Sequence, residues 1–161
     1  MKLNQSARLL LLSLIVSVIH HTDHVLRIDH SGWPFLPQIT SFTYSLLVYP
    51  IFLFIFLAKP WYQVFGTAFL FLFATIAHIF FEPMGDKFHT WAYGSNLSGH
   101  IGEENMLRQN SVFLGVCSIV LAMFLSLVLF ATLLSFIKEA RRAKTNNFIE
   151  NNLKPANSRS V

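Results

Sequence analysis

Ionisable side chains gather at the end of the first apolar run of the sequence, in the octapeptide His20–Arg27, which reads HHTDHVLR. His20 and His24 are four positions apart and Asp23 follows His20 by three, so a helix turns these three side chains toward one face. His21 points about 100° away from them. Imidazole nitrogens and a carboxylate at this spacing are typical ligands of zinc or iron. The octapeptide therefore predicts a metal site.

A later apolar run ends in a similar way, with His78 followed four positions later by Glu82. This spacing again places both side chains on one helical face. At a rise of 1.5 Å per residue, His24 and His78 lie about 22 and 21 Å along their runs, so the two helices can share a site. We expect His20, His24 and His78 to be metal ligands. Asp23 or Glu82 would act as a further ligand or as a general base.

Two alternatives use the same residues differently. Haem b needs only two axial histidines, one from each run, and leaves Asp23 and Glu82 without a role. In a purely structural arrangement, Asp23 pairs with Arg27 four residues later, and the histidines hydrogen-bond to Thr43, Tyr44 or the backbone. The chain would then be a non-catalytic structural or accessory membrane protein.

Arg27, Trp33 and Tyr44 are candidate contacts for a substrate. A guanidinium suits an anionic headgroup, and aromatic rings favour the interface between membrane and water. Charged groups are costly inside a membrane, and their presence there indicates a use. A catalytic site of this kind would act on a lipid or another apolar molecule that arrives from the bilayer.

The elements that position these residues are expected to be membrane helices. Of the 161 residues, 53% are hydrophobic and 12% are charged, whereas about 25% are charged in soluble domains. Apolar runs of about the 20 residues that a span needs predict helices at residues 7–26, 39–58, 61–81 and 111–137. We expect an all-α, four-helix transmembrane bundle as one domain, residues 1–144. A flexible polar tail is expected at residues 145–161.

Basic residues predict the orientation, since they mark the cytoplasmic ends of membrane spans. The ends that would lie together on that side carry Lys2, Arg8, Lys59, Lys138, Arg141, Arg142 and Lys144. Both termini are therefore expected in the cytoplasm, and the histidines in the outer half of the membrane or on its outer surface. This predicts a multi-pass protein of the cell (inner) membrane. Topology also explains the net charge of +4 without a nucleic-acid partner.

Two further segments suggest how the bundle is covered and packed. The connection at residues 84–110 is long enough to be a lid, a binding loop or a disordered segment, and we expect it to cover an outer pocket formed by the first three spans. In the fourth span, Gly115, Ser118, Ala122 and Ser126 recur at intervals of three and four. Such a seam of small residues lets another helix approach closely.

Overall fold

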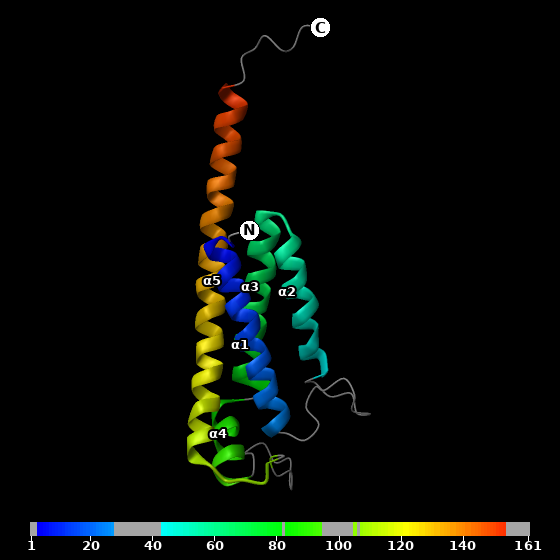
Figure 1. The fold of residues 1–161 in the computed structure, drawn as a ribbon, viewed down its shortest axis with the longest axis vertical. Helices are drawn as coiled ribbons and strands as arrows, with labels where there is room; N and C mark the ends of the chain where they lie inside the picture. Colours follow the sequence, from blue (N-terminus) through cyan, green and yellow to red (C-terminus); the bar gives the residue numbers. More distant parts are fainter. Residues whose placement is uncertain (1–2, 28–42, 82, 95–104, 106, 154–161) are drawn as a thin grey trace.

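A computed structural model shows a chain built from helices (Figure 1). It describes residues 3–27, 43–81, 83–94, 105 and 107–153, and every regular element within these ranges is helical. The α-helices are α1 (Gln5–Arg27), α2 (Val48–Leu57), α3 (Pro60–Ile76), α4 (Met84–Tyr93) and α5 (Val112–Leu153). A 3-10 turn, Thr43–Leu47, leads into α2, and a π-helical turn, Ala77–Phe81, continues α3. The expected all-α class is confirmed.

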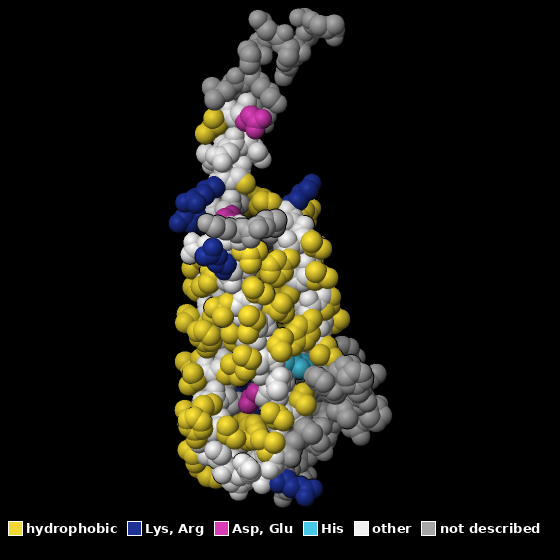
Figure 2. Space-filling model, in the orientation of Figure 1, with side chains coloured by type: hydrophobic (Ala, Val, Ile, Leu, Met, Phe, Trp, Pro, Cys, Tyr) yellow, Lys and Arg dark blue, Asp and Glu magenta, His cyan; other side chains and the backbone are white. Residues whose placement is uncertain are grey.

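Three helical segments are long and apolar enough to cross a membrane, namely Gln5–Arg27, Pro60–Phe80 and Val112–Glu150. Only 22% to 33% of the apolar part of each is buried, and Figure 2 shows the resulting hydrophobic surface around the middle of the molecule. An outer surface this apolar suits hydrocarbon. These segments match three of the expected spans. The remaining one corresponds to the shorter apolar helix Ser45–Leu57, and residues 39–42 lie outside the described ranges.

The helices pack around α5, which contacts α1, α3 and α4, while α2 packs against α3. α1 and α5 run in opposite directions, so the end of α1 lies beside the beginning of α5 (Figure 1). α4 lies across this end of the bundle. We call it the outer end, because the sequence predicts that it faces the outer side of the membrane. The opposite end, with the N-terminus and the turn between α2 and α3, is called the inner end.

The buried face of α1 is polar along its length. Ser6, Ser13, His20 and Arg27 follow one another at intervals of seven residues and are at most 8% exposed. Seven residues are close to two helical turns, so these side chains lie on one side of the helix. Leu10 and Val16 add apolar packing on the same face. A membrane helix with this pattern needs polar partners on its neighbours.

Hydroxyl groups of α5 supply these partners nearer the inner end. Ser6 Oγ lies 2.6 Å from Ser135 Oγ, and Ser13 Oγ lies 3.0 Å from Thr132 Oγ1. The bonds link residues that are more than a hundred positions apart in the sequence. They fix how α1 is placed along α5.

Ser13→Ala is expected to lower the free energy of unfolding in detergent by about 0.6 kcal/mol, since hydrogen bonds between membrane helices contribute about that amount. Denaturation with sodium dodecyl sulfate, followed by circular dichroism, measures the difference. Ser126→Ala is the control, because Ser126 donates to Ala122 O within α5. An equal loss in both variants would contradict an interhelical contribution.

The connection at residues 84–110 differs from the irregular loop that was expected, because its first ten residues form α4. Pro83 precedes the helix with an extended backbone. Asp86 lies in the first turn, where its carboxylate interacts favourably with the helix dipole. Gly94 ends the helix in the left-handed conformation, with φ of 74°. Residues 95–104 and 106 lie outside the described ranges. At least the start of this connection is therefore a packed element.

The polar tail that was expected at residues 145–161 begins as helix, because α5 continues to Leu153. Adding a residue to an existing helix is much easier than starting a new one. The segment after Lys138 contains helix-favouring Ala, Arg, Lys and Glu. Figure 1 shows this part of α5 projecting beyond the inner end. Residues 154–161 lie outside the described ranges.

The small-residue seam of α5 is occupied within the chain. A Cβ atom on Gly115 would lie 2.9 Å from Phe88 Cδ2 and 3.0 Å from Phe88 O, so α4 packs directly on this glycine. Ser118 donates to Asp23 of α1, and Ala122 is fully buried. The close approach predicted from the seam is thus made by α4 and α1.

Candidate functional site

The last turns of α1 present polar side chains to different neighbours, because each residue is rotated by about 100° from the one before. The rings of His20 and His78 contact each other across α1 and the π-helical turn. Asp23 hydrogen-bonds to α4 and α5. His21 faces the segment that leads into α2, where its Nδ1 lies 3.3 Å from Ser45 Oγ. The octapeptide therefore serves two separate clusters at the outer end.

His20, His24 and His78, which we call the histidine group, form the first cluster. The ring centroids of His20 and His78 are 4.8 Å apart, and those of His20 and His24 are 5.8 Å apart. His20 is 8% exposed and His78 is 7% exposed. In both contacts the ring planes are nearly perpendicular, at 89° and 85°. The structure thus brings together the imidazoles that the sequence predicts as ligands.

His78 lies in the π-helical turn Ala77–Phe81. Such turns are uncommon and occur often at functional sites. Glu82 and Trp33 lie outside the described residues, as does the side chain of Tyr44.

The arrangement of ligating atoms is less complete than the sequence predicts. Among the described residues, no three His, Cys, Asp or Glu side chains are placed to hold a metal ion. Asp23 was expected to converge with His20 and His24, but its carboxylate is engaged on α4 and α5. The histidine group is therefore a set of neighbouring rings whose nitrogens do not meet at one point.

Asp23 is the centre of the second cluster, which we call the Asp23 network. Its Oδ2 atom accepts from Ser118 Oγ at 2.7 Å and from Arg27 Nε at 3.2 Å, and its Oδ1 atom accepts from Trp91 Nε1 at 2.9 Å. The Arg27 side chain is 0% exposed and that of Asp23 is 14% exposed. The network joins α1, α4 and α5. It confirms the ion pair between Asp23 and Arg27 that the structural alternative predicts.

Arg27 was predicted to contact an anionic headgroup, and this contact stays a prediction. In the structure Arg27 is 1% exposed. A buried charge requires an opposite charge and further hydrogen bonds. Arg27 therefore belongs to the interior of the bundle.

Several residues of the outer end were missed by sequence reasoning. On α4, Asp86, Lys87, Thr90 and Trp91 are all 5% exposed or less. Their spacing of one and four places them on one helical face, a pattern that periodicity could have found. Ser118 was noted only as a small residue. Nothing in its spacing indicates that it hydrogen-bonds to a carboxylate on another helix.

The segment after α4 is tied back to this helix. Buried Asn105 donates through Nδ2 to Gln109 O at 2.8 Å and to Thr90 O at 3.4 Å. The backbone N–H of Ser111 donates to Trp91 O at 2.7 Å. These bonds hold the segment that leads into α5 against the end of α4. The bond from Ser111 also fixes the backbone of Trp91.

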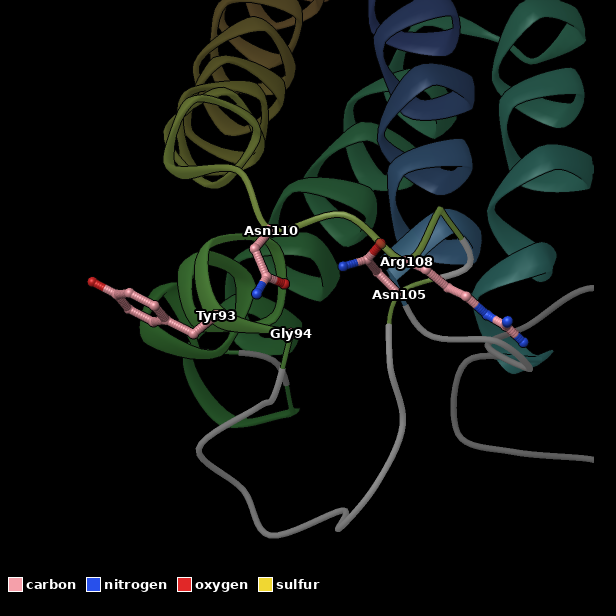
Figure 3. A pocket seen from close by; sticks show the side chains of 5 residues that line it. All are labelled: Tyr93, Gly94, Asn105, Arg108 and Asn110. Atoms are coloured by element: carbon pink, nitrogen blue, oxygen red, sulfur yellow. The ribbon is translucent and has the colours of Figure 1, made fainter.

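A cavity of about 280 Å³ lies at the outer end, beside the C-terminus of α4. Its lining residues are Tyr93, Gly94, Asn105, Arg108 and Asn110. The cavity lies between the end of α4 and the chain that leads into α5. Figure 3 shows the Asn105 and Asn110 amides reaching into this space, while the side chains of Tyr93 and Arg108 point away from it. This cavity differs in place from the pocket that was expected among the first three spans.

The chain matches no family model, no curated protein and no solved structure. The histidine group supplies imidazoles with ligating capacity, and the Asp23 network supplies a fixed scaffold beside them.

Proposed function

We propose that this protein is a four-span membrane protein that binds a divalent transition-metal ion, zinc or iron, at His20, His24 and His78. Both termini lie in the cytoplasm, and the metal lies in the outer half of the cell (inner) membrane. The orientation is supported by the exposed basic residues at the inner end, which Figure 2 shows where α5 leaves the bundle. The short apolar helix that contains α2 is the remaining span.

One observation carries the metal site, namely the separation of the rings. Imidazole nitrogens bind zinc at about 2.0–2.1 Å, so two imidazoles on one tetrahedral ion have centroids roughly 5 Å apart. The contacts of His20 with His78 and His24 are 4.8 and 5.8 Å. The separations therefore suit a shared ion. The rings need to turn about their side-chain bonds before their nitrogens converge.

Three histidines would leave a position free for a fourth ligand. Catalytic zinc sites keep such a position open for water or substrate, whereas structural sites close it. Glu82, placed by the sequence near His78, is the candidate protein ligand or general base. With the position open, the ion would activate water or polarise a lipid or another apolar substrate that enters from the bilayer.

The same contacts argue against haem b between His20 and His78. Axial nitrogens on opposite sides of an iron ion stand about 4 Å apart if each bond is about 2.0 Å long, and the centroids lie farther out. A porphyrin would also have to pass between two rings that touch edge to face. Binding haem there would require α1 and the π-helical turn to separate.

The second candidate is a non-catalytic structural or accessory protein. The observation that favours it is the Asp23 network, in which both carboxylate oxygens are hydrogen-bonded to groups of the protein. Here the polar residues only hold α1, α4 and α5 together. The two candidates differ in whether the histidine group binds metal.

The test is a titration of the full chain, purified in detergent and stripped with a chelator, with Zn²⁺ or Fe²⁺ in a calorimeter. We expect roughly one ion per chain, and an affinity lowered more than about 100-fold by His78→Ala, since even the loss of an outer-shell partner costs about 10- to 100-fold. His21→Ala is the matched control, because His21 is adjacent to His20 but faces Ser45. It should leave the affinity unchanged.

Different results would overturn the proposal in favour of its alternatives. Zinc or iron that does not bind, or that binds equally to His78→Ala, would support the structural candidate. A Soret band in the purified protein would support haem. His78→Gln, which retains a side chain of similar size, gives the affinity if the alanine variant does not fold.

A further inference from the structure

An exposed side of α5 changes from apolar to basic at the inner end. Leu127, Phe130 and Leu134 are exposed by 63%, 43% and 51%. Lys138 follows Leu134 by four positions, Arg141 and Arg142 follow Lys138 by three and four, and all three cations are exposed. Residues three or four positions apart share a helical face, so one continuous strip passes from hydrocarbon side chains to cations.

The length of α5 allows this change to fall at the depth of the lipid headgroups. From Val112 to Lys138, α5 rises about 39 Å, which is enough to cross a hydrocarbon layer of about 30 Å. Arg142 lies about 6 Å beyond Lys138 along the axis, and the headgroup layer is roughly 5–8 Å thick on each side. In a span that ends near Lys138, the cations would lie at the level of the lipid phosphates.

The other elements at the inner end add positive charge. Arg8 of α1 and Lys59 at the start of α3 are exposed. The neighbouring acid, Glu139, accepts a hydrogen bond of 3.3 Å from Nδ2 of Asn4, the residue before α1. Figure 2 shows Lys and Arg side chains at this level of the face in view. Positive charge therefore lies on several elements at the inner end, where α5 leaves the bundle.

We infer that Lys138, Arg141 and Arg142, supported by Arg8 and Lys59, form a binding surface for anionic phospholipids of the inner leaflet. Guanidinium groups bind phosphate with two hydrogen bonds. The apolar strip on the outer side of these cations, Leu127, Phe130 and Leu134, holds the acyl chains of the same lipid. This surface serves a role beyond orientation, and it does not depend on the metal site.

The test uses the purified full chain in nanodiscs of phosphatidylcholine containing 30% phosphatidylglycerol. The chain is already folded when the nanodiscs form, so substitutions of its cations do not act through membrane insertion or orientation. Native mass spectrometry after release counts the retained lipids of each class. We expect preferential retention of phosphatidylglycerol. Arg142→Gln should reduce this preference about fivefold and Arg141→Gln with Arg142→Gln about 25-fold, since each juxtamembrane cation contributes about 1 kcal/mol.

Arg108→Gln is the matched control, because it removes an exposed cation from the outer end. It should leave the preference within about twofold, while Arg141→Lys with Arg142→Lys should retain most of it, because the charge persists. Equal retention of the two lipids by the native chain would overturn the inference. So would a double glutamine variant with an unchanged preference.

Discussion

Asp23→Asn is expected to lower the free energy of unfolding in detergent by about 3 kcal/mol, the lower end of the cost of breaking a buried ion pair. The carboxylate accepts from Arg27, Trp91 and Ser118. Asparagine has the same shape but only one acceptor oxygen, and its NH2 group faces a donor. The loss also removes the negative charge beside buried Arg27. Denaturation followed by tryptophan fluorescence measures the effect.

Thr22→Ala is the control for this change. Thr22 is next to Asp23 and exposed, and its hydroxyl donates only to Val18 O of the same helix among the bonds of the described residues. A double-mutant cycle with Ser118→Ala isolates the bond between Ser118 and Asp23, and we expect a coupling of about 1 kcal/mol or more. A loss in Asp23→Asn no larger than in Thr22→Ala would show that the network does not stabilise the fold.

The sequence predicted the membrane helices well because hydrophobic length is a local property. Apolar runs such as 111–137 show a span without any knowledge of its neighbours. α4 was not predicted, because ten residues with a glycine at the second position give a weak helical signal on their own. Its stability comes from packing Phe88 and Trp91 against α5 and α1. Such contacts cannot be read from the segment itself.

The candidate site was predictable only in part, and for the same reason. The pair of Asp23 and Arg27 follows from a spacing of four, which is fixed within one helix. Trp91 and Ser118 lie 68 and 95 residues from Asp23, so their contacts depend on how the helices pack. Matching depth predicted that His24 and His78 share a site, whereas the ring contact that the structure shows for His78 is with His20. The π-helical turn at His78 carried no recognised sequence signal.

The two clusters of the outer end are mechanically connected through α1. Asp23 lies between His20 and His24, so bonds that fix the rotation of Asp23 also fix the direction of both histidines. A rotation of one residue step, about 100°, would turn His20 away from the π-helical turn. The Asp23 network thus positions one side of the histidine group. Metal affinity should fall in variants that loosen this network.

Gly115→Val is expected to release α4 from α5 and to lower the free energy of unfolding by about 3 kcal/mol, near the upper end of the cost of overpacking. The Cβ atom alone would lie 3.0 Å from Phe88 O. This neighbour is backbone, so α4 has to move as a unit. Trp91 moves with it, and its hydrogen bond to Asp23 weakens. Hydrogen exchange of the amides of α4, followed by mass spectrometry, measures the release.

Cys117→Val tests whether added bulk alone has this effect. Cys117 lies two residues away on the same helix and is exposed, so its replacement places a valine against lipid or detergent rather than against α4. We expect its α4 amides to exchange as in the native chain, while those of Gly115→Val exchange at least tenfold faster, which corresponds to about 1.4 kcal/mol of lost protection. Equal exchange in the two variants would mean that Gly115 does not hold α4. The position of Trp91 would then depend on the Asp23 network and on the backbone hydrogen bond from Ser111.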